Sequence, residues 1–479
     1  MEIENSNALE LRNYFDELSE KRISIRNRNI YYWNEITNYC SYFSHADNSI
    51  LEVGCGTGDL IASIPGKYKV GIDFSPKMIE IATKRFQNIS FFVLDAKNFN
   101  LDYKFDLIIF SNLIGFVDDV QEVFNNIKKI SHNRTKIIIT YYNHLWEPIL
   151  KIGERIGMKQ ISPLQNWLSQ SDIKNLLYLE NFEVYRESKR MIIPYNIPII
   201  STLTNNYIAK LPFFKLLCIN NYTFARPVQN INQTNDNGNE FSVTIIIPVR
   251  NEGGNIENGL LRIPEFGKWQ EIIYIEGNST DDTWEQVKNV SEKYKNTHKI
   301  ICAKQAGKGK NDAVKKGFSM ASGDILMILD GDLTVPPEEL PKFYNALAFS
   351  KGDFINGCRL VYPMEKQAMR TLNILGNKFF SLMFTWLLEQ PLKDTLCGTK
   401  VLFRSDYEKM AENRAFFGDF DPFGDYDLLF GAYKLNLKII EIPVHYKERT
   451  YGTTNISRFK HGLILLKMCL FAARKIKFR

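Results

Sequence analysis

The 479-residue chain has no uninterrupted apolar stretch of the roughly 18 to 20 residues that a membrane-spanning helix requires. Its three longest apolar segments, residues 191–203, 379–388 and 462–473, are each short and broken by Lys, Pro or polar residues. Segments of this kind favour core helices or strands, with a position on a membrane surface as the alternative.

The chain also lacks the cysteine patterns of a disulfide framework or a zinc site. Its seven cysteines lie far apart, and none forms a C-x-x-C pair. The first twenty residues are acidic and lack the basic and apolar regions of a signal peptide. We therefore expect reduced thiols and a cytoplasmic location, with peripheral association on the inner face of the membrane as an alternative.

A dense basic stripe is absent as well. The chain has 60 Lys and Arg against 54 Asp and Glu, a net charge of only +6, and these residues are spread along the sequence. An Asn/Asp-Pro-Pro-aromatic motif, typical of nucleic-acid methylation, is not found. We expect no nucleic-acid partner.

What the sequence does contain is two α/β halves joined by a polar segment. Residues 229–240 read QNINQTNDNGNE and favour a flexible linker between domains at 1–228 and 241–479. Short apolar runs alternate with amphipathic stretches on both sides, which predicts an α/β fold with parallel strands in each domain. The expected strands are 49–53, 69–72, 89–94, 105–110 and 136–141, then 242–248, 271–275, 299–303, 325–329, 353–356 and 438–442.

A glycine-rich turn follows the first expected strand. Residues 50–58 read ILEVGCGTG, which places Gly54, Gly56 and Gly58 between an apolar strand and a helix. Glycines let the backbone turn sharply beside a ligand, and a helix N-terminus offers free N–H donors. Asp73 and Asp95 end the next two expected strands, so three neighbouring strand ends carry residues suited to a nucleoside.

The pattern Glu-x-Gly-x-Gly-x-Gly that begins at Glu52 resembles the first motif of class I S-adenosylmethionine-dependent methyltransferases. The dinucleotide pattern Gly-x-Gly-x-x-Gly fails at Asp59, and a phosphate-binding turn is the remaining alternative. The resemblance covers residues 31–142 and implies a Rossmann-like domain with S-adenosylmethionine as cofactor. Glu52 and the turn glycines would hold the methionine part, Asp73 the ribose, and Asp95 with Ala96 the adenine.

The same resemblance implies that Asp106, Ser111 and Asn112 line the reaction cleft. Methyl transfer from a sulfonium needs in-line approach and little else, because the donor is already activated. A base is needed only for acceptors such as hydroxyls. His144 and Glu147 follow the last expected strand of this half, and His144 is our candidate base, with a structural histidine as the alternative.

In the C-terminal half, acidic residues again follow successive strands. Glu252 lies in the loop after the strand that Pro248 stops, Glu276 follows the next strand, and Asp330-Gly331-Asp332 ends a long apolar one. Two carboxylates beside each other offer the hard oxygen ligands that Mg²⁺ or Mn²⁺ prefers. Such an ion could bridge a nucleoside diphosphate and make it a better leaving group.

In this order, these features resemble the inverting family 2 glycosyltransferases of the GT-A fold. The resemblance implies a nucleotide-sugar donor whose nucleoside is flanked by Glu252 and Glu276 and whose phosphates are assisted by Lys308. Asp330 and Asp332 would hold the metal. The family usually has Asp where this chain has Glu276, which leaves the nucleotide base open.

Direct inversion needs a base unless the acceptor is already a phosphate anion. Asp425 lies at the position where the family places its base, and it is preferred to Asp419 and Asp421. Arg449 and Arg458 are cations suited to closing over a diphosphate. The processive Gln-x-x-Arg-Trp motif is absent, which favours transfer of a single sugar.

Residues 372–404 look like the membrane-facing region of polyprenyl-phosphate sugar synthases. This segment has an apolar face, and the C-terminal tail is basic, so both would lie on the bilayer interface, or else cap the domain. The residues of the apolar face are Phe379, Phe380, Met383, Phe384, Trp386 and Leu387. We expect a bifunctional enzyme of glycan or glycolipid biosynthesis with a glycan, glycolipid or polyprenyl-phosphate acceptor. The alternatives are a polyprenyl-phosphate glycosyl synthase with an independent methyltransferase, or one degenerate domain that serves as a scaffold.

Overall fold

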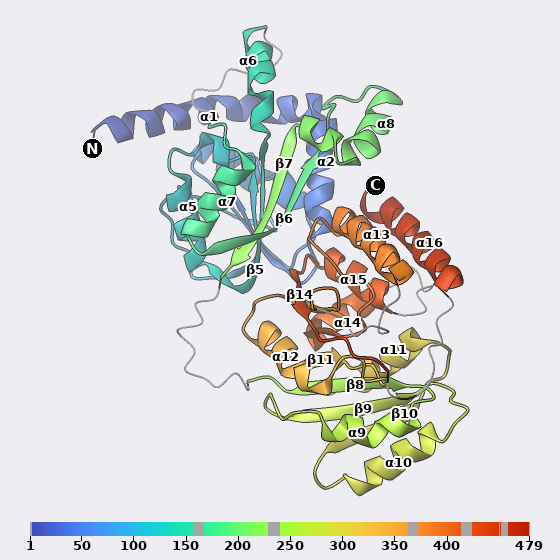
Figure 1. Ribbon diagram of the computed structural model, residues 1–479. Coiled ribbons are helices and arrows are strands. Elements are labelled where there is room, and N and C mark those ends of the chain that lie inside the picture. The colour runs from blue at the N-terminus through green and yellow to red at the C-terminus, as the bar shows by residue number, and fades with distance from the viewer. Residues whose placement is uncertain are drawn as a thin grey trace. The chain divides into compact units, whose positions relative to one another are not determined.

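The computed structural model describes residues 2–156, 166–228, 240–362, 371–412, 424–449, 451 and 458–478, with the backbone alone described for 2–8, 371–375 and 458–461. The chain divides into two compact units, with the boundary between Gln229 and Asn230. Each unit is a mixed α/β structure around one seven-stranded sheet (Figure 1).

The N-terminal sheet has the strand order β3-β2-β1-β4-β5-β7-β6. The strands β1 to β5 run parallel, whereas β7 is antiparallel to both β5 and β6. Their bounds are β1 (Ser49–Val53), β2 (Tyr68–Asp73), β3 (Ser90–Val93), β4 (Phe105–Ser111), β5 (Ser131–Tyr142), β6 (Phe182–Arg190) and β7 (Asn220–Pro227). Because parallel strands end at one edge, the loops after β1 to β5 meet there.

Helices cover this sheet, and α5 and α7 lie side by side on it (Figure 1). Polar caps start several of them. Ser75 Oγ accepts the N–H of Met78 at the start of α4, and Ser169 with Asp172 forms a capping box at α7. The bounds are α1 (Glu2–Arg28), α2 (Ile30–Tyr42), α3 (Asp59–Ser63), α4 (Pro76–Arg85), α5 (Val120–Lys129), α6 (Glu147–Arg155), α7 (Gln170–Leu179) and α8 (Ile200–Asn206).

The C-terminal sheet has the order β10-β9-β8-β11-β13-β12-β14. The first four strands are parallel, and β13 is antiparallel to β11 and β12. The bounds are β8 (Val243–Val249), β9 (Gln270–Glu276), β10 (Lys299–Lys304), β11 (Ile325–Ile328), β12 (Phe354–Cys358), β13 (Lys400–Phe403) and β14 (Ile439–Pro443). Strand β8 is central, so the loops after β8, β9 and β11 converge on the same edge.

The helices of this unit pack on both the sheet and one another. Their bounds are α9 (Ile256–Leu261), α10 (Thr283–Lys293), α11 (Lys310–Met320), α12 (Leu340–Ala348), α13 (Thr371–Leu388), α14 (Arg404–Glu412), α15 (Asp425–Lys434) and α16 (Arg458–Ile476). Buried aliphatic residues of β8, β9 and β11 form the centre of the core together with Phe343 and Tyr344 of α12.

The apolar face expected to meet a membrane is only partly buried inside this unit. Phe380, Phe384 and Leu387 of α13 are at most 8% exposed. The Phe384 ring lies 4.4 Å from that of Tyr426 in α15, and α13 packs against α16. The domain core therefore covers these three side chains, which fits the capping alternative for them. Phe379 is 50% exposed, and Met383 and Trp386 are partly exposed, so lipid contact of these three stays a prediction.

The apolar segment 191–203, which the sequence favoured as a core element, has exposed side chains instead. Ile199, Ile200 and Leu203 are 74%, 54% and 51% exposed, so the prediction of a core element is wrong for these side chains. Within the described parts of the chain, no helix is long and apolar enough to span a bilayer.

Candidate functional site

The turn after β1 is built on three glycines with left-handed backbones. Gly54, Gly56 and Gly58 have φ angles of 74°, 52° and 79°, a region that other residues enter only with strain. The N–H of Gly54 donates to the carbonyl of Ile72 in β2, over 2.8 Å, so the turn is tied to the neighbouring strand. The turn is therefore sharp, as the sequence predicts, and its approach to a ligand stays a prediction.

Glu52 lies beneath this turn and is only 2% exposed. Its carboxylate accepts the backbone N–H of Ile61 in α3 over 3.0 Å. Burial removes water from the charged form and raises the pKa of Glu52 to about 8. The carboxyl is therefore harder to ionise than that of an exposed glutamate.

Asp73 and Asp95 flank the same edge at the ends of β2 and β3. Asp73 accepts the N–H groups of Gly56 and Ser75 at 2.8 and 3.0 Å, and burial raises its pKa. Asp95 is exposed just after β3 and accepts the N–H of Lys97, while Ala96 is partly buried beside it. The structure thus brings Glu52, Asp73 and the Asp95–Ala96 pair to one edge.

Helix α1 contributes residues to this edge that the sequence did not indicate. The ring of Phe15 packs edge-on against Phe74 and Phe116, with centroids 5.6 and 5.3 Å away. Asp16 of α1 accepts a short hydrogen bond from the hydroxyl of Ser75. Since Phe74 directly follows Asp73, these contacts place α1 over the loop after β2.

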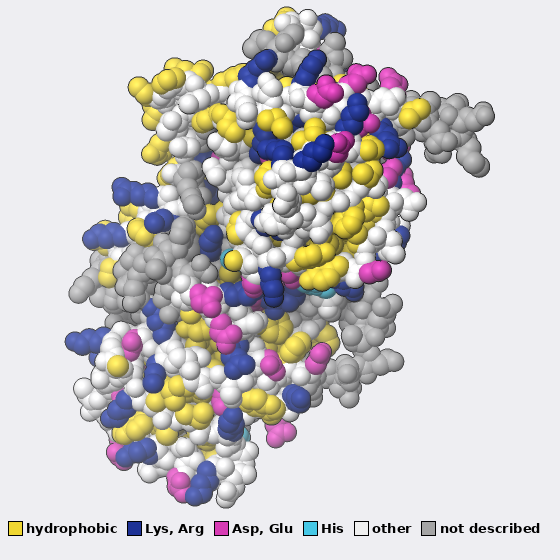
Figure 2. Space-filling view, turned by 180° about the vertical axis from the view of Figure 1, so that it is seen from behind, with side chains coloured by type: hydrophobic (Ala, Val, Ile, Leu, Met, Phe, Trp, Pro, Cys, Tyr) yellow, Lys and Arg dark blue, Asp and Glu magenta, His cyan; other side chains and the backbone are white. Residues whose placement is uncertain are grey.

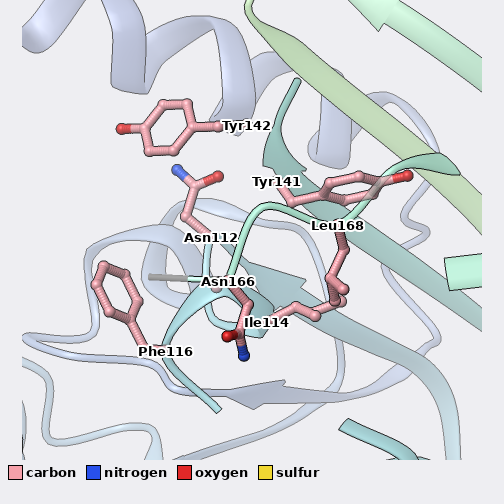
Figure 3. A pocket seen from close by; sticks show the side chains of 8 residues that line it. Asn112, Ile114, Phe116, Tyr141, Tyr142, Asn166 and Leu168 are labelled. Carbon is pink, nitrogen blue, oxygen red and sulfur yellow. The ribbon is translucent and has the colours of Figure 1, made fainter. Parts of the chain in front are cut away.

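A pocket opens between the ends of β4 and β5 (Figure 3). About 340 Å³ of space not filled by atoms lies at this site, and part of it is open solvent. Its walls come from the loop after β4, the end of β5 and the segment before α7: Asn112, Ile114, Gly115, Phe116, Tyr141, Tyr142, Asn166 and Leu168. The lining is aromatic and amide in character and includes no acidic, basic or histidine side chain.

The polar groups of this pocket are connected to α2. The amide of Asn112 donates to the hydroxyl of Tyr32 over 2.8 Å, and Tyr32 donates onward to Asn220 over 3.0 Å. The rings of Tyr32 and Tyr142 stack at 6.1 Å, and Figure 3 shows the Asn112 amide beside Tyr142. Burial raises the pKa of both tyrosines, so their hydroxyls stay protonated near neutral pH.

Two residues that the sequence predicted for the reaction cleft of this half, Asp106 and His144, lie outside the pocket lining. Asp106 lies at the amino end of β4, where it binds the N–H of Ser49 and the His132 ring, so the expectation that it lines the cleft is wrong. His144 lies two residues beyond Tyr142 in a short 3₁₀ helix. It is outside the pocket lining, and its buried Nδ1 has no hydrogen-bond partner among the described residues.

In the C-terminal unit, the loops after β8 and β9 are joined by hydrogen bonds. Glu252 is buried, and its backbone N–H donates to the hydroxyl of Thr283 over 2.9 Å. Glu276 is also buried, and its carboxylate accepts the N–H of Ser279 over 2.5 Å. Pro248, within β8, aligns with Ile275 of β9. The two glutamates therefore lie at neighbouring strand ends, as expected.

The Asp-x-Asp pair carries basic partners. Asp330 forms a short ion pair with Lys310, the first residue of α11, and Asp332 pairs with Arg449 over 2.5 Å. Arg449 also contacts Glu252 over 3.1 Å. Burial opposes ionisation of Asp330, but Lys310 outweighs it and holds the pKa of Asp330 below its usual value.

Burial and the neighbouring charges together bring the pKa of the Glu252 carboxyl close to neutral pH. Burial is the main cause and raises its pKa to about 7, while Arg449 opposes this rise and the Asp332 charge adds to it. Between the two aspartates, Gly331 leaves no room for a side chain, because a Cβ there would lie 2.8 Å from the carbonyl of Pro248. The close packing of β8 on this loop needs the glycine.

Lys310, two residues after Lys308, is a lysine of this segment that the sequence did not assign to the site. Lys308 is exposed in the loop before α11, whereas Lys310 is the lysine that contacts Asp330. The spacing of the Gly-Lys-Gly-Lys segment could not distinguish the two. Helix α16 begins at Arg458, but its side chain lies outside the described residues, as do Asp419 and Asp421.

Asp425 begins α15 and is buried near the same lysine. The charge of Asp425 raises the pKa of Lys310, which places the two groups within electrostatic reach. Its carboxylate also pairs with Lys400 over 3.0 Å, and Lys400 is fully buried. The structure thus assembles Asp330, Asp425, Lys310 and Lys400 from four separate segments.

A second buried pair supports this region and was missed by the sequence. The Arg359 guanidinium binds Asp394 through two hydrogen bonds of 2.7 and 2.9 Å, and Asn377 donates to the same carboxylate. Arg359 also acts electrostatically on Asp330 and lowers its pKa. The two partners are 35 residues apart and follow no motif that would have indicated the contact.

The charges at this edge include no preformed cage for a metal ion. Among the residues that the structure describes, no group of three or more His, Cys, Asp or Glu side chains is positioned to bind a metal. Asp330 and Asp332 together supply carboxylate oxygens beside two cations. A divalent ion here would have to take its remaining ligands from phosphate or water oxygens.

Family models match both halves of the chain. The model for a methyltransferase domain matches residues 44–183, and that for glycosyl transferase family 2 matches residues 244–411. The first match includes the glycine turn and the β5 strand, and the second includes Glu252, Glu276 and the Asp-x-Asp pair.

Similar proteins match the C-terminal half. Dolichol-phosphate mannosyltransferase of Pyrococcus furiosus is 38% identical over 121 residues, which cover 25% of this chain and 33% of that protein. Undecaprenyl-phosphate 4-deoxy-4-formamido-L-arabinose transferase of Pectobacterium carotovorum is 30% identical over 227 residues, 46% of this chain and 64% of that protein. The chain therefore spans less than two thirds of the length of these curated relatives.

Solved structures resemble each half at low identity. A methyltransferase from Thermotoga maritima gives a TM-score of 0.34 at 18% identity and covers 44% of this chain and 97% of its own. Glucosyl-3-phosphoglycerate synthase from Mycobacterium tuberculosis gives 0.35 at 15%, covering 49% and 80%. One polypeptide joins a methyltransferase domain to a family 2 glycosyltransferase domain.

Proposed function

We propose that the chain is a bifunctional enzyme of glycan or glycolipid biosynthesis. One site transfers a methyl group from S-adenosylmethionine, and a separate site transfers a sugar from a nucleotide-sugar donor with inversion. One observation carries this proposal. Each of the two compact units has its own sheet, and each sheet has its own set of acidic residues at the carboxyl ends of its parallel strands. A protein with one degenerate domain would not need both sets.

At the methyl-donor site, Asp73 is the residue that accepts the ribose hydroxyls, and Asp95 with Ala96 meets the adenine. Glu52 and the three turn glycines hold the methionine part. A donor bound along this edge would direct its methyl group toward the pocket after β4. The acceptor then lies between Asn112 and Tyr142, whose positions are held by Tyr32.

Methyl transfer at this pocket depends mainly on positioning. The lining offers protonated tyrosines and amides, which orient an acceptor but do not deprotonate it. His144 is the base for a hydroxyl acceptor, since its unpartnered Nδ1 lies just beyond Tyr142. An acceptor that is already nucleophilic needs no such base.

At the glycosyltransferase site, Glu252 and Glu276 flank the nucleoside beside Pro248, and Arg449 and Lys310 balance the charge of the diphosphate. Lys308 and Arg458 are further cations for the phosphates. Asp330 and Asp332 would hold Mg²⁺ or Mn²⁺, which when bound stabilises charge on the leaving diphosphate. Lys310 and Arg449 offset the repulsion between the two nearby aspartates, because each cation pairs with one of them.

The acceptor of the sugar is a polyprenyl phosphate. The two relatives named above act, by their names, on dolichol phosphate and undecaprenyl phosphate. Asp425 is the base that a hydroxyl acceptor would require, yet its carboxylate is buried and already paired with Lys400. A phosphate acceptor is itself an anionic nucleophile, so the reaction proceeds without Asp425 taking a proton.

This function is tested with labelled sugar nucleotides. The full chain is incubated with Mn²⁺, polyprenyl phosphate and UDP-, GDP- or dTDP-sugars, and the organic phase is extracted. We expect label from one donor in an organic-soluble product that mild acid releases.

Two variants provide the controls. Asp332→Asn removes a proposed metal ligand and should abolish transfer, whereas Glu292→Gln, on the exposed surface of α10, should leave it unchanged. Label found only in a water-soluble glycan would contradict the polyprenyl-phosphate acceptor while leaving the transferase assignment intact. Transfer that persists in Asp332→Asn would contradict the site itself.

A further inference from the structure

The N-terminal unit carries an apolar surface that its own fold leaves uncovered. One part is a stripe along and beside α6, in which Leu145, Ile149, Ile152 and Ile156 are 53 to 63% exposed. The spacing of these residues places them on one side of a helix. None of the residues of α6 is buried, so the described structure gives this helix no core to pack against.

A second apolar group lies in and around α8. Ile199 and Phe213 are about three quarters exposed, and Leu203, Leu216 and Leu217 are about half exposed. Figure 2 shows hydrophobic side chains gathered at the upper left, over α8. Isolated exposed leucines are ordinary on protein surfaces, but a contiguous group of this size marks an interaction site.

Hydrogen bonds connect the two groups to each other and to the acceptor pocket. The indole N–H of Trp146, just before α6, donates to the carbonyl of Leu217 over 3.0 Å. The amide of Asn143 donates to the carbonyls of Leu216 and Cys218 at 3.1 and 2.9 Å. Asn143 directly follows Tyr142 of the pocket. We call the two groups together the apolar rim.

The charges of this region favour one kind of occupant. Residues 188–235 contain no Asp or Glu, and Lys189, Arg190, Lys210 and Lys215 are the charged residues of the stretch that carries α8. Arg190 pairs with Glu35 and Lys210 is buried, but Lys189 and Lys215 are partly exposed. The α8 part of the surface is therefore edged by cations and has no acid in its own segment, whereas Glu147 and Glu154 of α6 are balanced in number by Lys151 and Arg155. An apolar surface whose only unbalanced charge is positive suits the headgroups and upper acyl region of an anionic bilayer.

We propose that the apolar rim is a membrane-docking surface, through which the methyltransferase unit inserts α6 and the α8 segment into an anionic lipid surface. The acceptor pocket then faces the bilayer side of the unit, so the methyl acceptor is presented from the membrane. This docking is separate from any lipid contact of the C-terminal unit. It does not depend on which sugar or nucleotide the other site uses.

The experiment places an environment-sensitive fluorophore on the full chain. Cys302 is the partly exposed cysteine and is first replaced by Ser, since the other six are buried. Single cysteines are then introduced as Phe213→Cys or Ile152→Cys on the rim. The matched control is Tyr178→Cys on α7, a side chain 74% exposed in the same unit but outside the rim.

With phosphatidylcholine vesicles that contain phosphatidylglycerol, we expect a blue shift and brighter emission at positions 213 and 152 and no change at 178. Pure phosphatidylcholine should give a weaker response, and added salt should reduce the anionic response. A Phe213→Glu substitution in the chain labelled at 152 should also reduce it. This substitution is exposed, so the fold is retained.

Three results would overturn the proposal. The first is sedimentation of the chain with vesicles while the emission at positions 213 and 152 stays unchanged, which would assign lipid contact to the other unit. The second is failure of the chain to sediment with anionic vesicles. Finally, a shift at 213 without vesicles that grows with protein concentration would show that a second copy of the chain covers the rim.

Discussion

Glu52 is the residue whose charge most directly couples the methyl donor to pH. Burial raises its pKa to about 8, so in the free chain it is mainly protonated at neutral pH. S-adenosylmethionine carries a sulfonium and an ammonium group, and both favour the ionised carboxylate. Binding must therefore release a proton from Glu52 wherever the pH is below this pKa.

We predict that the affinity for S-adenosylmethionine falls as the pH is lowered from 8, by up to about tenfold per unit. Calorimetry in buffers of different ionisation heat measures both the dissociation constant and the released proton. Glu52→Gln should bind more weakly and without this pH dependence. The raised pKa also affects folding. Because the folded chain holds the Glu52 proton more tightly than the unfolded chain, the contribution of Glu52 to the free energy of unfolding falls as the pH rises from about 4.5 toward 8. A wild-type affinity that does not change with pH would refute the coupling.

Gly398 tests the ion pair at the sugar-nucleotide site. A Cβ at this position would lie 2.0 Å from Asp330 Oδ2 and 2.2 Å from Lys310 Nζ. Gly398→Ala must therefore push these two side chains apart. The atoms that the new Cβ would meet are the ends of the Asp330 and Lys310 side chains, which can move without unfolding the unit. We predict that the variant keeps its fold and loses Mn²⁺-dependent binding of the sugar nucleotide, measured by thermal shift. Gly376→Ala, where a Cβ meets no atom within 4 Å, is the control.

The acidic residues that follow apolar strands could be predicted from the sequence, because the strand fixes their place at the sheet edge; Asp425 was chosen from the family resemblance instead. Apart from Arg449, the basic partners could not be predicted. Lys310, Lys400 and Arg359 come from segments whose approach depends on the folded chain, and no spacing rule connects them to the Asp-x-Asp pair. Asp106 was misplaced because a resemblance in sequence order does not state which end of a strand faces the cleft.

At the scale of elements, the parallel strands were predicted close to their observed bounds because buried parallel strands read as continuous apolar runs. The antiparallel strands were missed. β6 reads FEVYRESKR, in which charged residues interrupt the pattern, and β13 has only four residues. Their pairing depends on partners far away in the sequence, such as Ala225 of β7 opposite Val184 of β6.

Helix α1 gives a prediction at this scale. Its docking beside the donor site includes the two edge-on ring contacts of Phe15, each worth about 0.5–1.5 kcal/mol, beside the hydrogen bond that Asp16 accepts from Ser75. Phe15→Ala should release α1 locally, increase amide exchange around residues 12–20 and weaken S-adenosylmethionine binding by about tenfold. Leu9→Ala, which changes an exposed residue of the same helix, should do neither. Unchanged exchange in Phe15→Ala would mean that other contacts hold the helix.

At the scale of the whole molecule, the chain combines two chemistries that use different donors. The division between Gln229 and Asn230 gives each unit its own sheet, core and edge of acidic residues. Each site is therefore complete within one unit, and substitutions in one should leave donor binding in the other intact. Fusion would then serve a shared pathway or a shared membrane location.

A thermal-shift donor screen tests this two-site account most directly. The wild type is measured with S-adenosylmethionine and with UDP-, GDP- and dTDP-sugars in the presence of Mn²⁺, and the same screen is repeated on Asp73→Ala and Asp332→Ala. We predict that the wild type responds to S-adenosylmethionine and to one class of sugar nucleotide. Asp73→Ala should lose only the first response and Asp332→Ala only the second. Loss of both responses in either variant would contradict the account.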